Sequence, residues 1–286
     1  MILVTGAGGK TGRAFIQAAA KREPLRGLSR RPEQIPELKA LGAAQAIHAD
    51  LRDEAALRTA MQGVRAVYHI CPNMSPDELV IGKLVIGEAR AARVGHFVYH
   101  SVLHPQIGKM PHHWQKLRVE ELLFESGLPF TVLQPAPYMQ NLLAGWQNIV
   151  EDGLLQVPYS VDSKFSFVDI EDVAEAVALV LTGPGHVNAI YELAGTLPVS
   201  HVEVAEIFSR RLNRDVRAEK EEIRDWRLRA TAMSEYAVET LVRMFEYYDQ
   251  WGLAGSPNAL KWILKREPAS FEKFIDRMLK EQDAIP

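Results

Sequence analysis

Three glycines near the start of the chain are spaced so that they can hold a phosphate. Gly6, Gly9 and Gly12 follow a short apolar, β-branched run and precede a stretch with the pattern of a helix. Gly6 lets the chain turn tightly, Gly8 or Gly9 lets the backbone approach a pyrophosphate, and Gly12 lets the helix pack close to the sheet. The alternative is a loop that only needs positive φ angles. A strand, a glycine-rich turn and a helix in this order favour a dinucleotide-binding site.

The end of the second predicted strand indicates which dinucleotide fits. In NAD-specific sites, an acidic residue at this point binds the ribose 2′-hydroxyl. Here Ser29 is followed by Arg30 and Arg31, with no carboxylate, and Lys10 adds positive charge on the same side. Two guanidinium groups can bind a 2′-phosphate, so we expect NADPH/NADP+ as the cofactor. The alternative is that both arginines are solvated loop charges.

Short apolar segments alternate with helical patterns through the first half of the chain. The strand candidates are residues 2–5, 25–29, 44–49, 66–70, 96–101 and 130–133. Helices are expected over 13–20, 53–61, 77–92 and 111–126, and Asp53 can cap the second of these. This alternation predicts an α/β fold with a doubly wound parallel sheet of the Rossmann type.

The alternation loosens after Pro137, which suggests a second part of the chain. We expect a helix over 169–177, a strand over 190–193, and amphipathic helices over 200–212, 233–249 and 268–280. The predicted domains are a dinucleotide-binding core, residues 1–150, and a smaller, mainly helical substrate lobe, residues 151–286, with 165–193 returning to the core. Four tryptophans of the later part suit an aromatic-walled pocket, or alternatively a core or an oligomer interface: Trp146, Trp226, Trp251 and Trp262.

Composition narrows the possible partners and cofactors. The formal net charge of -3 gives no reason to invoke nucleic acid or a membrane surface as the main partner. The single cysteine, Cys71, excludes an intramolecular disulfide and a cysteine-based metal site. His69, His100 and His104 lack metal-ligand spacing, so no metal is expected. Since no segment resembles a leader or reaches the ~20 apolar residues of a membrane span, we expect a cytoplasmic protein.

Several motifs, taken together, resemble the NmrA-like group of atypical short-chain dehydrogenases/reductases. They are residues 5–12, 29–30, 49–51, 98–101, Lys116 with 120–121, and 134–141. The resemblance covers roughly residues 1–195 well and the remainder loosely. It implies a Rossmann fold that binds NADP(H). Members of the family include NADPH-dependent reductases of triphenylmethane dyes, azo compounds, quinones and plant phenylpropanoids, and also regulators that bind NADP(H) without catalysis.

Carried over position by position, the resemblance implies a set of cofactor contacts. The pyrophosphate would lie on Gly6, Ala7, Gly8, Gly9, Lys10, Thr11 and Gly12. The 2′-phosphate would lie on Arg30 and Arg31, and the adenine between Asp50 and Leu51, although Asp50 could instead cap the next helix. The residues beside the ribose would be Cys71, Pro72 and Asn73. The nicotinamide end would lie against 135–141, which includes Pro135, with Tyr138 and Asn141 nearest.

The catalytic residues implied by the resemblance are altered in this chain. Short-chain dehydrogenases use Tyr-x-x-x-Lys on one helix face, with a serine from the preceding strand. Lys116 and Ser101 are present, but His112 stands where the tyrosine belongs. Lys116 would hold the nicotinamide ribose, and His112 could donate a proton near neutral pH. The alternatives are a structural pair between Lys116 and Glu120, and an exposed His112 at the helix start.

Loss of the tyrosine argues against simple alcohol and ketone chemistry. It leaves hydride transfer to acceptors that need little acid help. We therefore expect an NADPH-dependent reductase of a bulky conjugated acceptor of the quinone, azo or triphenylmethane-dye type, acting as a monomer or homodimer without nucleic-acid or membrane partners. The alternative is a non-catalytic NADP(H)-sensing regulator that binds a protein partner. Retention of Lys116 and of 135–141 favours the enzyme, and the missing tyrosine favours the sensor.

Overall fold

The computed structural model describes residues 1–283 and packs them into two compact units. The first unit comprises residues 1–108, 112–135 and 173–191, and the second comprises 109–111, 136–172 and the residues from Glu192 on. Three elements have residues in both units: α5 (Pro111–Glu125), through its first residue, α6 (Ile170–Thr182) and β8 (Ala189–Leu193). None of the helices among residues 1–283 is both long and apolar enough to cross a membrane.

The first unit is built on a seven-stranded sheet. Its strands are β1 (Ile2–Val4), β2 (Leu25–Ser29), β3 (Gln45–His48), β4 (Ala66–His69), β5 (His96–His100), β6 (Phe130–Pro135) and β8. The strand order is β3-β2-β1-β4-β5-β6-β8, and the pairs from β3 to β6 are parallel. Because the chain order reverses between β1 and β4, this is the doubly wound arrangement. The predicted fold class is confirmed.

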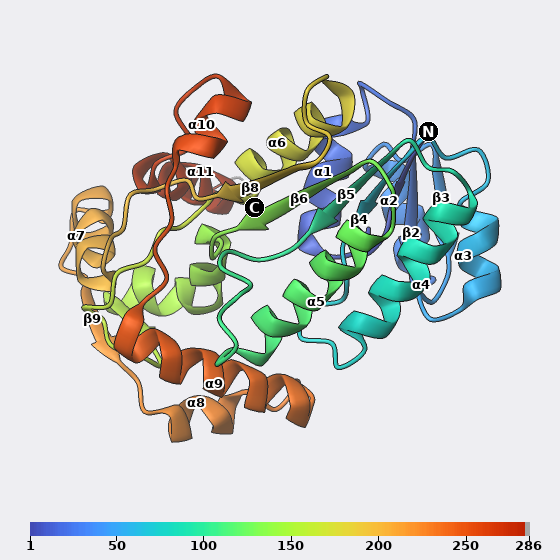
Figure 1. Cartoon of the computed structure of the whole chain (residues 1–286). Coiled ribbons are helices and arrows are strands. Elements are labelled where there is room, and N and C mark those ends of the chain that lie inside the picture. The colour runs from blue at the N-terminus through green and yellow to red at the C-terminus, as the bar shows by residue number, and fades with distance from the viewer. Residues whose placement is uncertain (284–286) are drawn as a thin grey trace. The chain divides into compact units, whose positions relative to one another are not determined.

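Helices cover both faces of this sheet, with α4 and α5 in front of the strands and α1 behind them in Figure 1. The helices of the first unit are α1 (Lys10–Ala19), α2 (Gln34–Ala40), α3 (Glu54–Ala60), α4 (Glu78–Ala91) and α5 (Pro111–Glu125). Leu57, Val85 and Val119 bring α3, α4 and α5 into one core cluster. A Cβ on Gly27 would contact Leu38 of α2 and Ile16 of α1 on the opposite face. Covered on both sides, the central strands β1 and β4 are buried along their whole length.

Side-chain caps explain where several helices begin. Asp53 Oδ1 accepts a hydrogen bond from the Ala56 N–H at 3.0 Å and caps α3, as its position predicts. Ser200 and Glu203 form a capping box at the start of the helix that follows β8. Each cap satisfies backbone N–H groups that have no partner inside the helix.

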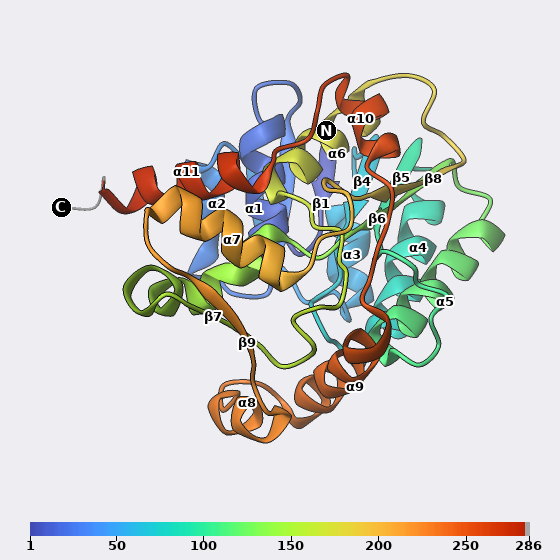
Figure 2. The same ribbon diagram turned by 90° about the vertical axis from the view of Figure 1, so that its left-hand side faces the viewer.

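The second unit is mainly helical. It contains a 3-10 helix (Met139–Gly145), a π-helix (Asn148–Asp152), the parallel pair β7 (Leu154–Val157) and β9 (Arg217–Lys220), and the helices α7 (His201–Leu212), α8 (Ile223–Arg229), α9 (Glu235–Trp251), α10 (Asn258–Leu264) and α11 (Phe271–Asp283). Figure 2 shows α7 beside α11, and an ion pair between Arg211 and Asp276 joins them. The three amphipathic helices predicted from the sequence correspond to α7, α9 and α11.

Aromatic side chains fill much of the core of this second unit. Tyr159, Phe165 and Tyr248 lie with ring centroids 5.2–5.6 Å apart. Trp146 packs edge to face on Phe208 at 5.7 Å. Two other tryptophans lie at the surface: Trp251 is 65% exposed and Trp262 is 75% exposed. The four tryptophans therefore do not act as a single group, and Trp146 is a core residue.

Candidate functional site

The carboxyl ends of the parallel strands bring the predicted site residues of the first unit to one edge of the sheet. The glycine turn follows β1, Arg30 follows β2, Asp50 lies two residues after β3, Cys71 lies two residues after β4, and Ser101 follows β5. In open α/β sheets, ligands bind outside this edge, at the point where the strand order reverses. Here that point lies between β1 and β4.

The glycine turn has the backbone geometry of a phosphate-binding loop. Gly6 has a φ of 58°, in the left-handed region, and its carbonyl accepts a hydrogen bond from the Gly9 N–H at 3.0 Å. A Cβ on Gly12 would lie 2.6 Å from Ala7 Cα, so the close approach of α1 requires glycine there. A Cβ on Gly9 would meet only the Gly6 carbonyl oxygen, at 3.4 Å, within the described chain. The backbone at Gly9 is therefore open to a ligand at the N-terminus of α1.

Gln34 closes one side of this turn, a role that the sequence did not reveal. Ser29 Oγ donates to Gln34 Oε1 at 2.6 Å, and Gln34 Nε2 donates to the Gly8 carbonyl at 3.2 Å. A Cβ on Gly8 would lie only 1.9 Å from Gln34 Oε1. Gly8 therefore makes room for the Gln34 side chain. In the sequence, Gln34 looks like an ordinary first residue of a helix, so no signal distinguished it.

Arg30 and Arg31 are exposed at the end of β2. Neither guanidinium forms a hydrogen bond or ion pair with any residue among 1–283. Asp50, in contrast, accepts hydrogen bonds from the Arg52 side chain at 2.8 Å and from the Arg52 N–H at 2.9 Å. These bonds lower the pKa of Asp50 to about 2 and keep it anionic. The two arginines are available for a 2′-phosphate, whereas the Asp50 carboxylate is already paired with the guanidinium group of Arg52.

Lys116 is buried and forms an ion pair that the sequence did not predict. Its Nζ donates to Glu78 Oε1 at 2.9 Å and to the His100 carbonyl at 3.2 Å. Glu78, which is fully buried in the first turn of α4, also accepts a hydrogen bond from the Tyr99 hydroxyl at 2.8 Å. Lys116 therefore pairs with Glu78 and not with Glu120. These two contacts hold the ammonium group of Lys116 in place inside the first unit.

The Ser101 hydroxyl is committed to a different carboxylate. It donates to Glu120, whose two oxygens also accept hydrogen bonds from Gln134 Nε2 at 3.0 and 3.1 Å. Burial raises the pKa of Glu120, and the bonds from Ser101 and Gln134 oppose that shift. Ser101 thus lies where the serine partner was expected, at the end of β5, but its proton is directed at Glu120.

His112 lies one turn before Lys116 on α5 and is buried. The alternative of an exposed histidine at the helix start is therefore wrong. Burial, followed by the nearby positive charge of Lys116, holds the pKa of His112 well below its ordinary value. The imidazole is therefore neutral near pH 7, and a neutral imidazole is a weak proton donor.

The loop after β4 borders the gap between β1 and β4. Thr5 Oγ1 donates to the Ile70 carbonyl at 3.0 Å and accepts from the Ile70 N–H at 2.8 Å, which ties the ends of the two strands together. Cys71 is buried, and burial raises the pKa of its thiol, so it stays protonated. Pro72 and Asn73 are exposed. The thiol is inert, and the exposed part of the loop is available to a ligand.

The segment 135–141 begins in the first unit with Pro135 and continues in the second. Tyr138 is half-buried, and Asn141 is exposed at the start of the 3-10 helix. Gln140 anchors the segment, since its Nε2 donates to Asp169 at 2.8 Å and its Oε1 accepts from the Ile170 N–H at 3.1 Å. The assignment of Tyr138 and Asn141 to the nicotinamide end remains a prediction.

Comparisons with known proteins extend this description. The model of the NmrA-like family matches residues 1–277. The chain is 33% identical over 224 residues to the NAD(P)H azoreductase of Xenophilus azovorans, covering 76% of each chain. It is 32% identical over 198 residues to quinone oxidoreductase 2 of Escherichia coli, covering 68% of each.

Two solved structures have the same fold. The NADPH complex of the Escherichia coli quinone oxidoreductase superposes with a TM-score of 0.86 at 25% identity, covering 98% of this chain and 100% of the other. The NADP(H) complex of the Citrobacter sp. triphenylmethane reductase has a TM-score of 0.84 at 22% identity, covering 96% and 99%. At that identity, the second likeness concerns the fold alone.

Proposed function

Because the chain belongs to the NmrA-like family, we propose that it is an NADPH-dependent reductase that transfers hydride to a bulky conjugated acceptor of the quinone, azo or triphenylmethane-dye type. The observation that carries the proposal is the open backbone at Gly9 with the unpaired guanidinium groups of Arg30 and Arg31 at the next strand end. Two relatives that exceed 30% identity bear the names azoreductase and quinone oxidoreductase, which supports this class of acceptor.

In this proposal the first unit supplies most of the cofactor contacts. The glycine turn and the N-terminus of α1 hold the pyrophosphate, and Arg30 with Arg31 holds the 2′-phosphate. Lys116, fixed by Glu78, contributes a positive charge beside the nicotinamide ribose. Bound NADPH supplies the hydride. The assignment of Tyr138 and Asn141 to the nicotinamide end rests on the family resemblance alone.

The proton required after hydride transfer comes from water in this proposal. The Ser101 hydroxyl donates to Glu120, and the imidazole of His112 is buried and neutral near pH 7. Neither group is therefore arranged as a general acid of the usual strength. Conjugated acceptors suit such a site, because charge that arrives with the hydride is spread over the acceptor.

The non-catalytic sensor is not favoured. Three relatives exceed 30% identity over two thirds of the chain, and all three are named as reductases or oxidoreductases. The division into residues 1–150 and 151–286, the monomeric or dimeric state and the cytoplasmic location remain predictions of the sequence.

Steady-state oxidation of NADPH tests the proposed function. The purified chain is mixed with NADPH and, in turn, a quinone, an azo dye and a triphenylmethane dye, and the loss of NADPH absorbance is followed. We expect turnover with at least one acceptor class and none in the Gly9→Val variant. Tight binding of NADPH without oxidation by any acceptor would instead support the sensor.

A further inference from the structure

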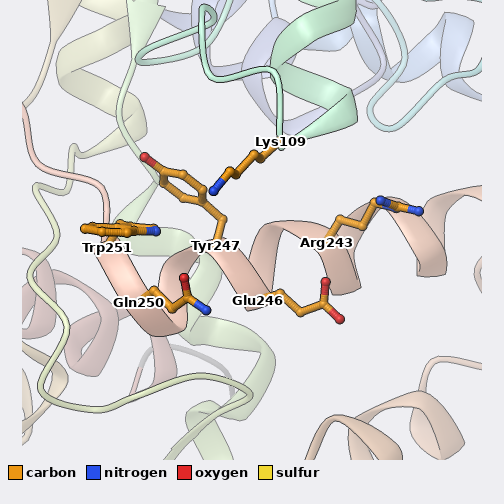
Figure 3. A pocket seen from close by; sticks show the side chains of 6 residues that line it. All are labelled: Lys109, Arg243, Glu246, Tyr247, Gln250 and Trp251. Atoms are coloured by element: carbon orange, nitrogen blue, oxygen red, sulfur yellow. The ribbon is translucent and has the colours of Figure 1, made fainter.

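A pocket on α9, within the second unit, combines aromatic rings with positive charges (Figure 3). Its volume is about 270 Å³, and it is lined by Lys109, Arg243, Glu246, Tyr247, Gln250 and Trp251. All of these residues except Lys109 share one face of α9, because they are spaced three, four, seven and eight positions from Arg243. Lys109 comes from the loop before α5, and Figure 3 shows its ammonium group extending toward the ring of Tyr247. The pocket therefore joins two separate segments of the chain.

The positive charges of this pocket are not neutralised by ion pairs. Neither Lys109 nor Arg243 forms a hydrogen bond or ion pair with a residue among 1–283. Nearby cations of the same unit do find partners, such as Lys220 with Asp249 at 2.7 Å. The lining residues include one carboxylate, Glu246, against two cations. The pocket thus keeps a net positive charge that an anion can neutralise.

Two large aromatic side chains of the pocket, Trp251 and Tyr247, are accessible to solvent. Trp251 is 65% exposed at the end of α9, and Tyr247, one turn earlier, is half-buried. On the opposite face of the same helix, Phe245 and Tyr248 are buried. Exposed rings next to a cation can stack on a flat ligand while the cation binds its polar end. The combination of aromatic surface and positive charge therefore favours a ligand that is both flat and anionic.

We propose that this pocket binds a flat aromatic anion, an aryl carboxylate or aryl sulfonate. The aryl plane lies against Trp251 and Tyr247, and the anionic group is bound by Lys109, with Arg243 at the other end adding to the positive field. The volume is close to the lower end of the ~300–1,000 Å³ range of small-molecule sites, which suits one or two fused rings. This site goes beyond the proposed reductase activity, since binding here requires neither NADPH nor turnover.

Isothermal titration of the full chain without NADPH tests the proposal. The probes are naphthalene-2-sulfonate and naphthalene-2-sulfonamide, which have the same rings but differ in charge near pH 7. We expect the sulfonate to bind about fivefold more tightly at low ionic strength, and to lose that advantage in high salt. Equal affinities of the two probes, or no binding of the sulfonate at millimolar concentration, would overturn the proposal.

Four variants locate the binding. Lys109→Met should weaken the sulfonate by roughly threefold to fivefold and leave the sulfonamide unchanged, because it removes only the charge. Trp251→Ala should weaken both probes by a similar factor through loss of stacking. The matched controls, Lys83→Met on α4 and Trp262→Ala on α10, replace exposed residues of the same types and should change neither affinity.

The outcome is independent of the cofactor site. The pocket is rejected if the sulfonate binds Lys109→Met as tightly as Lys83→Met. It is also rejected if the sulfonate binds Trp251→Ala as tightly as Trp262→Ala. NADPH titration of the same variants should match that of the original chain. If the pocket does not bind the sulfonate but the chain still oxidises NADPH, only this inference is rejected. If the pocket binds the sulfonate but the chain oxidises no NADPH, only the proposed function is rejected.

Discussion

The guanidinium group of Arg30 is expected to distinguish NADPH from NADH. A charge-assisted contact to a phosphate contributes on the order of 1.5–3 kcal/mol, and the guanidinium group of Arg30 forms no hydrogen bond or ion pair within residues 1–283. Arg30→Ala should therefore weaken NADPH by roughly tenfold or more and leave NADH nearly unchanged. Titration of both cofactors measures this, with Arg22→Ala as the control, since Arg22 lies beyond the opposite end of α1. Equal weakening of both cofactors would show that Arg30 does not bind the 2′-phosphate.

Variants of the buried pair of Lys116 and Glu78 can show whether Lys116 has a structural role or also binds the cofactor. Removing one partner of a buried pair leaves an unpaired charge and typically costs about 3–5 kcal/mol. Lys116→Met alone should therefore lower the unfolding free energy by several kcal/mol, and adding Glu78→Gln should restore much of it. Urea denaturation measures this part of the prediction.

NADPH affinity completes the test of Lys116. If Lys116 touches the ribose, the NADPH dissociation constant should stay raised in the double variant although its stability has recovered. Glu78→Gln alone serves as the control, because it keeps the lysine and can still accept the hydrogen bond from Tyr99. Recovery of NADPH affinity together with stability would assign Lys116 a purely structural role.

Gly9 lies where the glycine turn meets α1, and replacing it should abolish cofactor binding while the chain still folds. Gly9 has φ -79° and ψ 165°, extended values that valine adopts readily, and a Cβ there has space. Gly9→Val should therefore melt at nearly the unchanged temperature but bind no detectable NADPH, with Gly9→Ala intermediate. Thermal melting and NADPH titration measure the two properties. A folded Gly9→Val variant with unchanged NADPH affinity would contradict the cofactor assignment.

Element patterns in the sequence predicted the sheet but not the interior contacts of the site. Strands covered on both faces have apolar interiors, so β1 and the apolar centres of β4 and β5 were visible directly. The short, polar segments β9 and α8 carry no such pattern: β9 pairs with β7, and α8 contacts α9 through Trp226 and Phe245, whose ring centroids lie 4.8 Å apart.

Glu78 illustrates why contacts inside the site could not be predicted. In the sequence it is an acidic residue in the first turn of a helix, where carboxylates are common. Its burial follows from α4 lying against α5 and β5, which places Lys116 and Tyr99 beside it. The glycines and arginines, in contrast, were recognisable because their chemistry depends on local spacing. Glu78 was missed because its partners Tyr99 and Lys116 lie 21 and 38 residues away in the sequence.

Acid should destabilise the whole chain through its buried histidines. Burial lowers the pKa of His69 and His100 to about 3, and that of His96, His113 and His201 to about 4. Their ordinary pKa is ~6.5, so between pH 6.5 and 4 the unfolded chain binds more protons than the folded one. The stability from these groups is complete above about pH 6.5 and is lost as the pH falls, toward about 4 for the second set and toward about 3 for His69 and His100. The buried carboxyls of Glu120 and Asp172, whose pKa values are raised by burial, act in the opposite direction.

Urea denaturation at pH 7 and pH 5 measures this effect. Each neutral histidine contributes about 1.4 kcal/mol per pH unit inside its window, so the unfolding free energy should fall by several kcal/mol at the lower pH. Calorimetry in buffers of different ionisation enthalpy should show proton uptake on unfolding at pH 5. An unchanged or higher stability at pH 5 would mean that these histidines are accessible to protons in the folded chain.

Direct transfer of hydride from bound NADPH to a conjugated acceptor is the central claim, and a single-turnover isotope experiment tests it most directly. The chain is loaded with one equivalent of NADPH deuterated on one or the other face of nicotinamide C4, and is then mixed with a quinone or an azo dye. We predict that NADPH absorbance decays in one phase and that deuterium on one face, but not the other, slows this decay. Bound NADPH that persists unoxidised in the presence of every acceptor would contradict the account.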